Sequence, residues 1–216
     1  MAAKNGSTAT VEKPVEEVLA KAIELAPLVQ KTHMIDIVGL TPLILNRWSE
    51  KAKAQMSGKQ QGKAQTKKPP KDPEADFQSA RYLLPDGRDG MPSGAFKAAI
   101  VNACSHFDGV TKVLTKQAVR VEGIGPDLLV PIVGEVSMRE DMVRNATGVA
   151  DIRYRPQFWP WSTTLVITYV ASALSESALL SLLDAAGFGG VGEWRPSAPK
   201  SASGSFGMFK VARNDG

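Results

Sequence analysis

The most informative part of this chain is its glycine-rich end, which reads GFGGVGEWRP at residues 187–196 and SGSFGMFKV at residues 203–211. Six glycines lie from Gly187 to Gly207. Glycine has no Cβ and tolerates positive φ, so such a cluster lets another backbone or a ligand approach closely. The cluster does not open a helix after a strand, as a dinucleotide fingerprint does, and it lacks the Gly-Lys-Ser/Thr ending of a nucleotide-phosphate loop. We therefore expect it to contact a polymer or a partner protein.

Hydrophobic periodicity in the rest of the chain predicts both helices and strands. The predicted helices are Val15–Gln30, Gly94–Phe107 with Ser93 as its N-cap, and a third from the N-cap Ser175 to Gly187. The predicted strands are His33–Leu45, Ala80–Leu84, Val119–Gly123, Leu128–Val136, Val149–Tyr154, Trp161–Ala171 and Phe206–Arg213. When the segments that do not belong to the predicted core are left out, the order of the core elements is strand, helix, strand, strand, helix, strand. The expected fold class is therefore α+β, with a ferredoxin-like (βαββαβ, RRM-like) core.

The length and the composition fit one core with appended segments. The chain has 216 residues, of which 43% are hydrophobic, and a net charge of +4. We expect residues 1–31 to form an N-terminal arm and helix, and residues 32–216 to form the core domain, with residues 50–75 as a flexible basic insertion. The single cysteine, Cys104, excludes an intrachain disulfide, and the apolar runs are far shorter than the roughly 20 residues that cross a bilayer. We expect no membrane contact and a cytoplasmic location.

The basic insertion contains seven lysines and no acidic residue from residue 51 to residue 71. These lysines are Lys51, Lys53, Lys59, Lys63, Lys67, Lys68 and Lys71. An unbalanced run of cations can lie along a phosphate backbone and release its counterions. The alternative is a solvated linker kept soluble by its charge. The absence of a compensating acid favours the nucleic-acid interpretation, because solvated faces usually interleave both signs.

A second cationic stretch mixes arginines with aromatic residues. Its members are Arg139, Arg144, Arg153, Arg155, Tyr154, Phe158, Trp159 and Trp161. Arginine can bind a phosphate through two parallel hydrogen bonds, and aromatic faces stack on unpaired bases. The nearby acids Glu140, Asp141 and Asp151 leave an alternative open, in which the arginines form structural ion pairs and the aromatic residues belong to the core.

Two segments of the chain resemble one known family. GMPSGAFKAAI at residues 90–100 and the glycine-rich end from residue 189 are similar to the helix start and the last loop of the RAMP superfamily, the ferredoxin-like RNA-binding subunits of CRISPR effector complexes. The words MREDMVR and GVGEWRP also resemble uncharacterised phage-encoded proteins. The resemblance implies a phage-encoded, stand-alone relative that grips a nucleic-acid backbone and stacks head to tail. The contacts it implies are Ser93, Lys97, Gly190, Gly192 and Arg195.

The leading hypothesis is a self-associating protein that binds single-stranded RNA or DNA without catalysis. Its expected interface combines the seven lysines, the four arginines and the five implied contacts with Trp194 and Lys200 of the glycine-rich end. The expected partners are nucleic acid, further copies in an oligomer or filament, and other CRISPR-like subunits, with the N-terminal helix joining copies. We expect no cofactor and no metal, because the sequence has no Cys/His metal spacing.

Two alternatives stay open. One is a phage-type protein-interaction module that mimics or blocks a CRISPR-like host complex. The other is an RNA-processing endoribonuclease that uses His33 or Asp36, although neither residue lies in a recognisable catalytic motif.

Overall fold

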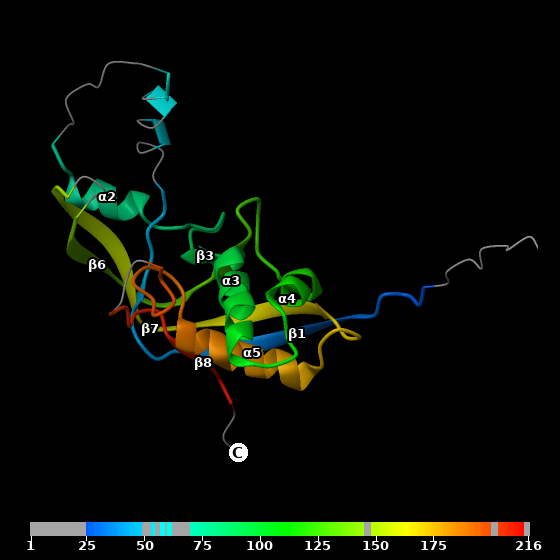
Figure 1. The fold of residues 1–216 in the computed structure, drawn as a ribbon. Coiled ribbons are helices and arrows are strands. Elements are labelled where there is room, and N and C mark those ends of the chain that lie inside the picture. Colours follow the sequence, from blue (N-terminus) through cyan, green and yellow to red (C-terminus); the bar gives the residue numbers. More distant parts are fainter. Residues whose placement is uncertain are drawn as a thin grey trace, which may run out of the picture.

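The computed structural model describes residues 25–48, 53–54, 57–58, 60–61, 70–144, 148–199 and 203–213 (Figure 1). The predicted N-terminal helix lies outside these residues up to residue 24, as do Lys51, Lys59, Lys63, Lys67, Lys68 and Lys200. Residues 25–29 belong to no helix and Gln30 begins the first strand, so the predicted helix end at Gln30 is wrong. In this part of the chain, no helix has the length and the apolar character that crossing a membrane requires.

One long strand, β7 (Ala150–Val170), organises the main sheet. Its antiparallel partners among the described residues are β1 (Gln30–Gly39), β2 (Leu43–Ile44), β4 (Val119–Val121) and β6 (Val133–Arg144). The last strand, β8 (Phe209–Val211), pairs antiparallel with the other edge of β1. A separate two-stranded sheet joins β3 (Gly90–Pro92) to β5 (Leu129–Pro131). The fold is therefore a mixed α+β fold with an antiparallel sheet, as the sequence predicts.

The strand β7 joins two segments that the sequence pattern separates. Val149–Tyr154 and Trp161–Ala171 look like different strands because Pro156 and Pro160 interrupt the alternation. In the structure the strand continues through both prolines, and Pro156 has a ladder partner, Met138, on β6. The predicted strand Leu128–Val136 shows the opposite error, because it is divided between β5 and β6.

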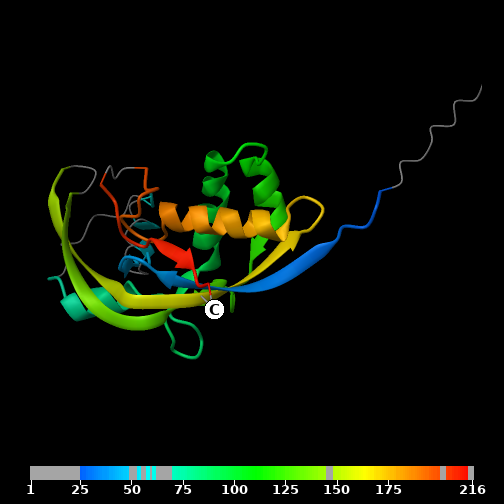
Figure 2. The same cartoon turned by 90° about the horizontal axis from the view of Figure 1, so that it is seen from below.

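Three helices cover one face of the main sheet (Figure 2). They are α3 (Ser93–Ala103), which a short 3₁₀ turn η1 (Cys104–His106) continues, α4 (Lys112–Ala118) and α5 (Glu176–Gly189). Another helix, α2 (Pro73–Ser79), packs against β7. The sequence pattern does not indicate α2 or α4, because each has only seven residues. Their local signals are the N-cap side chains of Asp72 and Thr111, each of which accepts a backbone N–H.

The core lies between the sheet and these helices. Ile35 and Ile37 of β1 and Leu165, Ile167 and Tyr169 of β7 point toward the helices, because alternate residues of a strand share a face. They pack against Phe96 and Ile100 of α3 and Leu179, Leu182 and Leu183 of α5. Each fully buried aliphatic side chain contributes about 2 kcal/mol.

Helix α5 confirms one predicted boundary and corrects the other. The Ser175 hydroxyl accepts a hydrogen bond from the Ala178 N–H at 3.1 Å, as predicted for its N-cap. The helix continues past Gly187 to Gly189 and ends at Gly190, whose φ is 69°. Gly187 has a different role, because a Cβ there would lie 2.0 Å from the carbonyl oxygen of Phe209. Glycine therefore lets β8 lie directly against the helix.

Two further predictions are wrong. Ala80–Leu84 forms no strand, because only Leu83 makes a bridge, to Asp89 across the turn that follows. Ser93 does not cap α3, because it is the first residue of that helix and the N-cap position holds Pro92 without a side-chain hydrogen bond. The Ser93 side chain is buried, and its N–H donates to the carbonyl of Leu128 at 2.8 Å.

Candidate nucleic-acid interface

The start of α3 and the glycine-rich loop, residues 190–197, meet around a cavity of about 210 Å³. These segments are far apart in the sequence, and the family resemblance singles out both of them. The helix contributes Ala95, Ala98, Ala99 and Asn102, whose small side chains leave the space open. The loop contributes Gly190, Gly192, Glu193, Arg195 and Ser197, and Asn46 and Tyr82 complete the polar lining. The structure thus brings three of the five contacts implied by the resemblance into one site.

The other two implied contacts do not line the cavity. Lys97 lies on α3 and is half-buried. Ser93 is buried among the residues below the helix start. Helix α3 lines the cavity through its alanine face and Asn102. The sequence pattern does not reveal this role, because alanines at helical spacing usually indicate packing between helices.

Backbone hydrogen bonds hold the glycine-rich loop in place. The Val191 N–H donates to the Gly207 carbonyl at 2.9 Å, and the Glu193 N–H donates to the Ile44 carbonyl at 2.9 Å. Gly192 has a φ of 80°, and a Cβ at this position would lie 2.5 Å from the carbonyl oxygen of Ile44. The close backbone approach predicted from the glycines is therefore real, and the protein's own chain after β2 accounts for it here.

Arg195 contributes a cation to the cavity wall. One of its guanidinium nitrogens, Nη1, donates to the carbonyl oxygen of Gly192 at 2.7 Å, which fixes the side chain over the loop. Tyr82 also lines the cavity, and burial raises the pKa of its phenol, an effect that the nearby Arg47 partly opposes. Both groups are hydrogen-bond donors at neutral pH. The cavity therefore presents donors suited to phosphate or base oxygens.

Two arginines of the cationic stretch, Arg139 and Arg155, stack on aromatic residues of the chain's glycine-rich end, Trp194 and Phe206. The guanidinium of Arg139 lies 5.4 Å from the ring centre of Trp194 and 4.9 Å from that of Phe206. Its Nε donates to Asp141 at 2.8 Å, and its Nη1 donates to Gln157 at 2.9 Å. The stack joins the β6–β7 hairpin to Trp194 of the glycine-rich loop, which is one of the predicted nucleic-acid contacts.

Arg155 extends the same stack into the interior. It is 1% exposed, and its guanidinium lies 5.2 Å from the ring centre of Trp194. Its Nη1 is 3.9 Å from Asp141 and 3.8 Å from Glu193. Burial lowers the pKa of this guanidinium, and the two carboxylates counteract that effect. For Arg139 and Arg155, the structure therefore supports the alternative in which the arginines form structural ion pairs.

The remaining predicted cations lie around the tip of the β6–β7 hairpin or on the insertion. Lys71 pairs with Asp151 at 2.7 Å and donates to the carbonyl oxygen of Ile152. Arg153 lies 3.8 Å from Asp151, and Arg144 donates to the carbonyl of Gly148 at 3.3 Å. Lys53 is exposed. The base of the basic insertion is therefore attached to the hairpin through Lys71.

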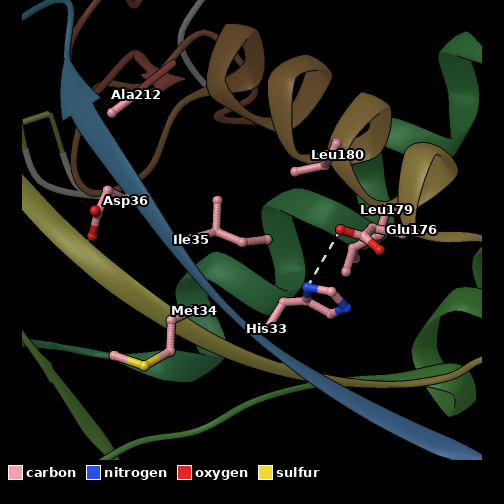
Figure 3. A pocket seen from close by; sticks show the side chains of 8 residues that line it. All are labelled: His33, Met34, Ile35, Asp36, Glu176, Leu179, Leu180 and Ala212. Carbon is pink, nitrogen blue, oxygen red and sulfur yellow. Dashed lines mark ion pairs between the residues drawn. The ribbon is translucent and has the colours of Figure 1, made fainter. Parts of the chain in front are cut away.

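A second cavity, of about 260 Å³, contains both residues proposed for a nuclease (Figure 3). His33 and Asp36 point to different sides of β1, as the alternation of a strand requires. The Nδ1 of His33 is 3.5 Å from Glu176 of α5, and its Nε2 is 3.4 Å from the hydroxyl of buried Tyr169. Asp36 accepts a hydrogen bond from Thr164 at 2.5 Å. The two residues therefore do not converge on one reacting atom.

The sheet face opposite the helices carries hydrogen-bonded polar side chains. The hydroxyls of Thr32 and Thr168 are 2.9 Å apart, and Thr168 also donates to Glu122 at 3.0 Å. Glu122 pairs with Arg120 at 2.8 Å. An RRM-type sheet binds RNA through exposed aromatic residues on its strands. These threonine and acidic side chains are unsuited to that mode, although Trp159 of β7 is 46% exposed.

Among the described residues, no three His, Cys, Asp or Glu side chains are grouped so that they could hold a metal ion.

Comparison with known proteins gives structural likenesses alone. Neither a protein-family model nor a curated protein matches the sequence. The crystal structure of Cmr6 from Pyrococcus furiosus is similar with a TM-score of 0.41 and 9% identity, over 86% of this chain and all of that one. A Cas6 product complex is similar with a TM-score of 0.29 and 13% identity, over 83% of this chain. The chain spans about half (51%) of the length of that Cas6 structure.

Proposed function

We propose that this chain is a RAMP-like protein that binds single-stranded RNA or DNA without catalysis and self-associates. The ferredoxin-like part of the proposal is supported by the order of the core elements, β1, α3, β4, β7, α5 and β8. In the sheet, β1 lies between β7 and β8, and β4 lies on the far side of β7. This is the strand arrangement of a doubled split βαβ unit.

The observation that carries the binding function is the cavity shared by α3 and the glycine-rich loop. Gly190, Gly192 and Arg195, predicted to contact a nucleic-acid backbone, line the same space as the alanine face of α3. Arg195 supplies a positive charge, and Asn46 and Asn102 supply amide donors and acceptors. The carboxylate of Glu193 also lines the cavity, and it lies 3.8 Å from Nη1 of the buried Arg155. We infer that a phosphate and its neighbouring base enter this cavity.

The basic insertion extends the proposed path of the strand. The insertion follows Trp48. Its end at Lys71 lies beside the β6–β7 hairpin, which is stacked on the glycine-rich loop. Its lysines can neutralise phosphates without reading base edges. Binding is therefore expected to be tolerant of sequence and sensitive to salt.

A charge placed in the cavity tests this proposal. Ala98 is exposed and lines the cavity, so the variant Ala98→Glu sets a carboxylate against an incoming phosphate. Val113 on α4 is 68% exposed and away from the cavity, so Val113→Glu makes the same charge change as a matched control. With uniform uridine and deoxythymidine oligonucleotides, we expect Ala98→Glu to weaken binding at least about tenfold more than Val113→Glu. Equal losses in the two variants would remove the cavity from the proposal.

Exchange of the seven insertion lysines for glutamine tests the path outside the cavity. If all seven contact phosphates, the slope of log K against log salt becomes shallower by roughly 5, at about 0.7 per contact on a single strand. An unchanged affinity and slope would contradict the path, and would favour the alternative of a protein-interaction module. Intact labelled RNA after long incubation with the protein and a divalent metal is the result expected for a protein without nuclease activity.

A further inference from the structure

Exposed apolar side chains gather at two opposite ends of the molecule. One group lies on the β6–β7 hairpin, where Met138 is 46% exposed and Met142 is 66% exposed. The other group lies on the segment before β1, where Leu25 is 86% exposed and Leu28 is 64% exposed. Apolar side chains clustered in this way mark an interaction surface more often than they mark ordinary surface.

The outer edge of β6 is unpaired in the described part of the chain. Among the described residues, this 12-residue strand pairs with β7 along one edge and with no strand along the other. A strand at the edge of a sheet presents a row of backbone N–H and C=O groups that another strand can bind. Charged side chains are the usual protection of such an edge. This strand carries the exposed Glu135, Glu140 and Arg144 and the inward-pointing Asp141, and between them it exposes the apolar Val133, Val136, Met138 and Met142.

The segment from Leu25 to Val29, here called the leader segment, continues outward from β1 beyond the end of the sheet (Figures 1 and 2). Gln30 pairs with Val170, the last residue of β7, and only the Val29 carbonyl bonds further, to the Ala171 N–H at 2.9 Å. The β6 pairing begins at Ser162 and extends away from this end. The nine residues from Ser162 to Val170 span roughly 26 Å over their eight steps, so the leader segment does not reach the β6 edge of its own chain.

We propose that the leader segment of one copy adds as a strand to the free edge of β6 in a second copy. Its five residues span about 16 Å, which fits within the roughly 40 Å of β6. Strand addition satisfies the open backbone groups, and it can place Leu28 on the face that carries the methionines of the hairpin, while Leu25 then lies on the opposite face. Pro27 is compatible with this position, because the added strand becomes the new edge and its outer N–H groups have no partner to lose.

The two surfaces of this contact differ, so a single contact joins two copies head to tail, and a reciprocal pair of contacts closes two copies into a dimer. It extends the self-association in the proposed function and replaces the N-terminal helix with residues 25–29 as the contacting segment. A five-residue strand buries less than a standard interface, so assembly in the absence of nucleic acid is expected to depend on protein concentration.

Disulfide cross-linking between two different variants tests the geometry. Leu28→Cys and Met138→Cys are purified separately, mixed and oxidised, while the native Cys104 is buried and stays out of reach. We expect a cross-linked pair on a non-reducing gel in the mixture, and none in either variant alone. A cross-link in Met138→Cys alone would show twofold pairing of β6 edges, and would overturn the proposal. An absence of cross-links in the mixture would overturn it as well.

Sedimentation equilibrium without nucleic acid tests the same contact and separates it from binding. The wild-type protein is expected to show mass that rises with concentration, and Leu25→Asp combined with Leu28→Asp is expected to stay monomeric. Val113→Asp, a similarly exposed apolar position, serves as the matched control and is expected to assemble like the wild type. The double variant should still bind an oligonucleotide too short for two copies, so loss of that binding points to the proposed function and not to the contact. A monomeric wild-type protein at all concentrations would refute the contact.

Discussion

Replacement of Gly187 by alanine measures how firmly β8 is held against α5. The added Cβ would lie 2.0 Å from the carbonyl oxygen of Phe209, whereas ordinary contact begins at 3.4 Å, so β8 has to retreat by about 1.4 Å. Overpacking of this kind costs about 1 to 3 kcal/mol. Exchange of glycine for alanine inside a helix returns about 1 kcal/mol. We expect the free energy of unfolding to fall by up to about 2 kcal/mol.

Gly189, two residues further along the same helix, provides the matched control. The nearest atom to a Cβ at Gly189 is the Cβ of Ser197 at 3.6 Å, which is an ordinary contact. Gly189→Ala is therefore expected to leave the free energy of unfolding unchanged or to raise it by up to about 1 kcal/mol. Urea denaturation followed by circular dichroism compares both variants with the wild type. Equal stabilisation by the two substitutions would refute the close approach of β8 to α5.

Two other predictions concern an N-cap and a buried phenol. Ser175→Ala is expected to lower the free energy of unfolding by about 1 kcal/mol, because the Ala178 N–H loses its acceptor; Ser181→Ala, at an exposed interior position of α5, is the control in the same urea assay and should show no loss. For Tyr82, burial raises the folded pKa above the ordinary value of 10.0, so its contribution is fully present below pH 10 and is lost as the pH rises through the folded pKa. Urea titrations between about pH 9 and pH 11 should therefore show a steeper decline in the wild type than in Tyr82→Phe; parallel declines would contradict the raised pKa.

The parts of the fold that could be predicted from the sequence are those with local signals. Ser175 indicates the start of α5, because a serine before an apolar helical pattern is a typical N-cap. Apolar and polar residues alternate along Trp161–Ala171 clearly enough to indicate a strand. The full length of β7 could not be predicted, because proline in a sequence usually indicates the end of a strand. Pro156 and Pro160 are tolerated inside β7 where the sheet needs no N–H group from them. The α+β class with an antiparallel sheet could be predicted from the same local signals.

The role of the arginines could not be settled by composition. Arg155 has the same neighbours in sequence whether it binds phosphate or forms internal ion pairs. The deciding contacts come from Glu193 and Trp194, almost forty residues further along the chain. The role of an arginine flanked by both aromatic residues and acids therefore cannot be predicted from its sequence neighbours. Its contacts depend on which distant segments of the chain pack against it in the fold.

The dependence of the sheet on β7 has a consequence for synthesis of the chain. β1 is made early, but its ladder partner on one side begins at Ser162 and its partner on the other side at Phe209. At roughly 5 to 20 residues per second, β1 waits about 6 to 25 s on the ribosome for the first of these partners. Throughout that delay Ile35 and Ile37 have no core to pack into, so the nascent chain exposes an apolar strand that is prone to aggregation. Pairing across such a long sequence separation is also slow in itself. Cellular yield of this protein is therefore expected to depend on chaperones that protect its first strand.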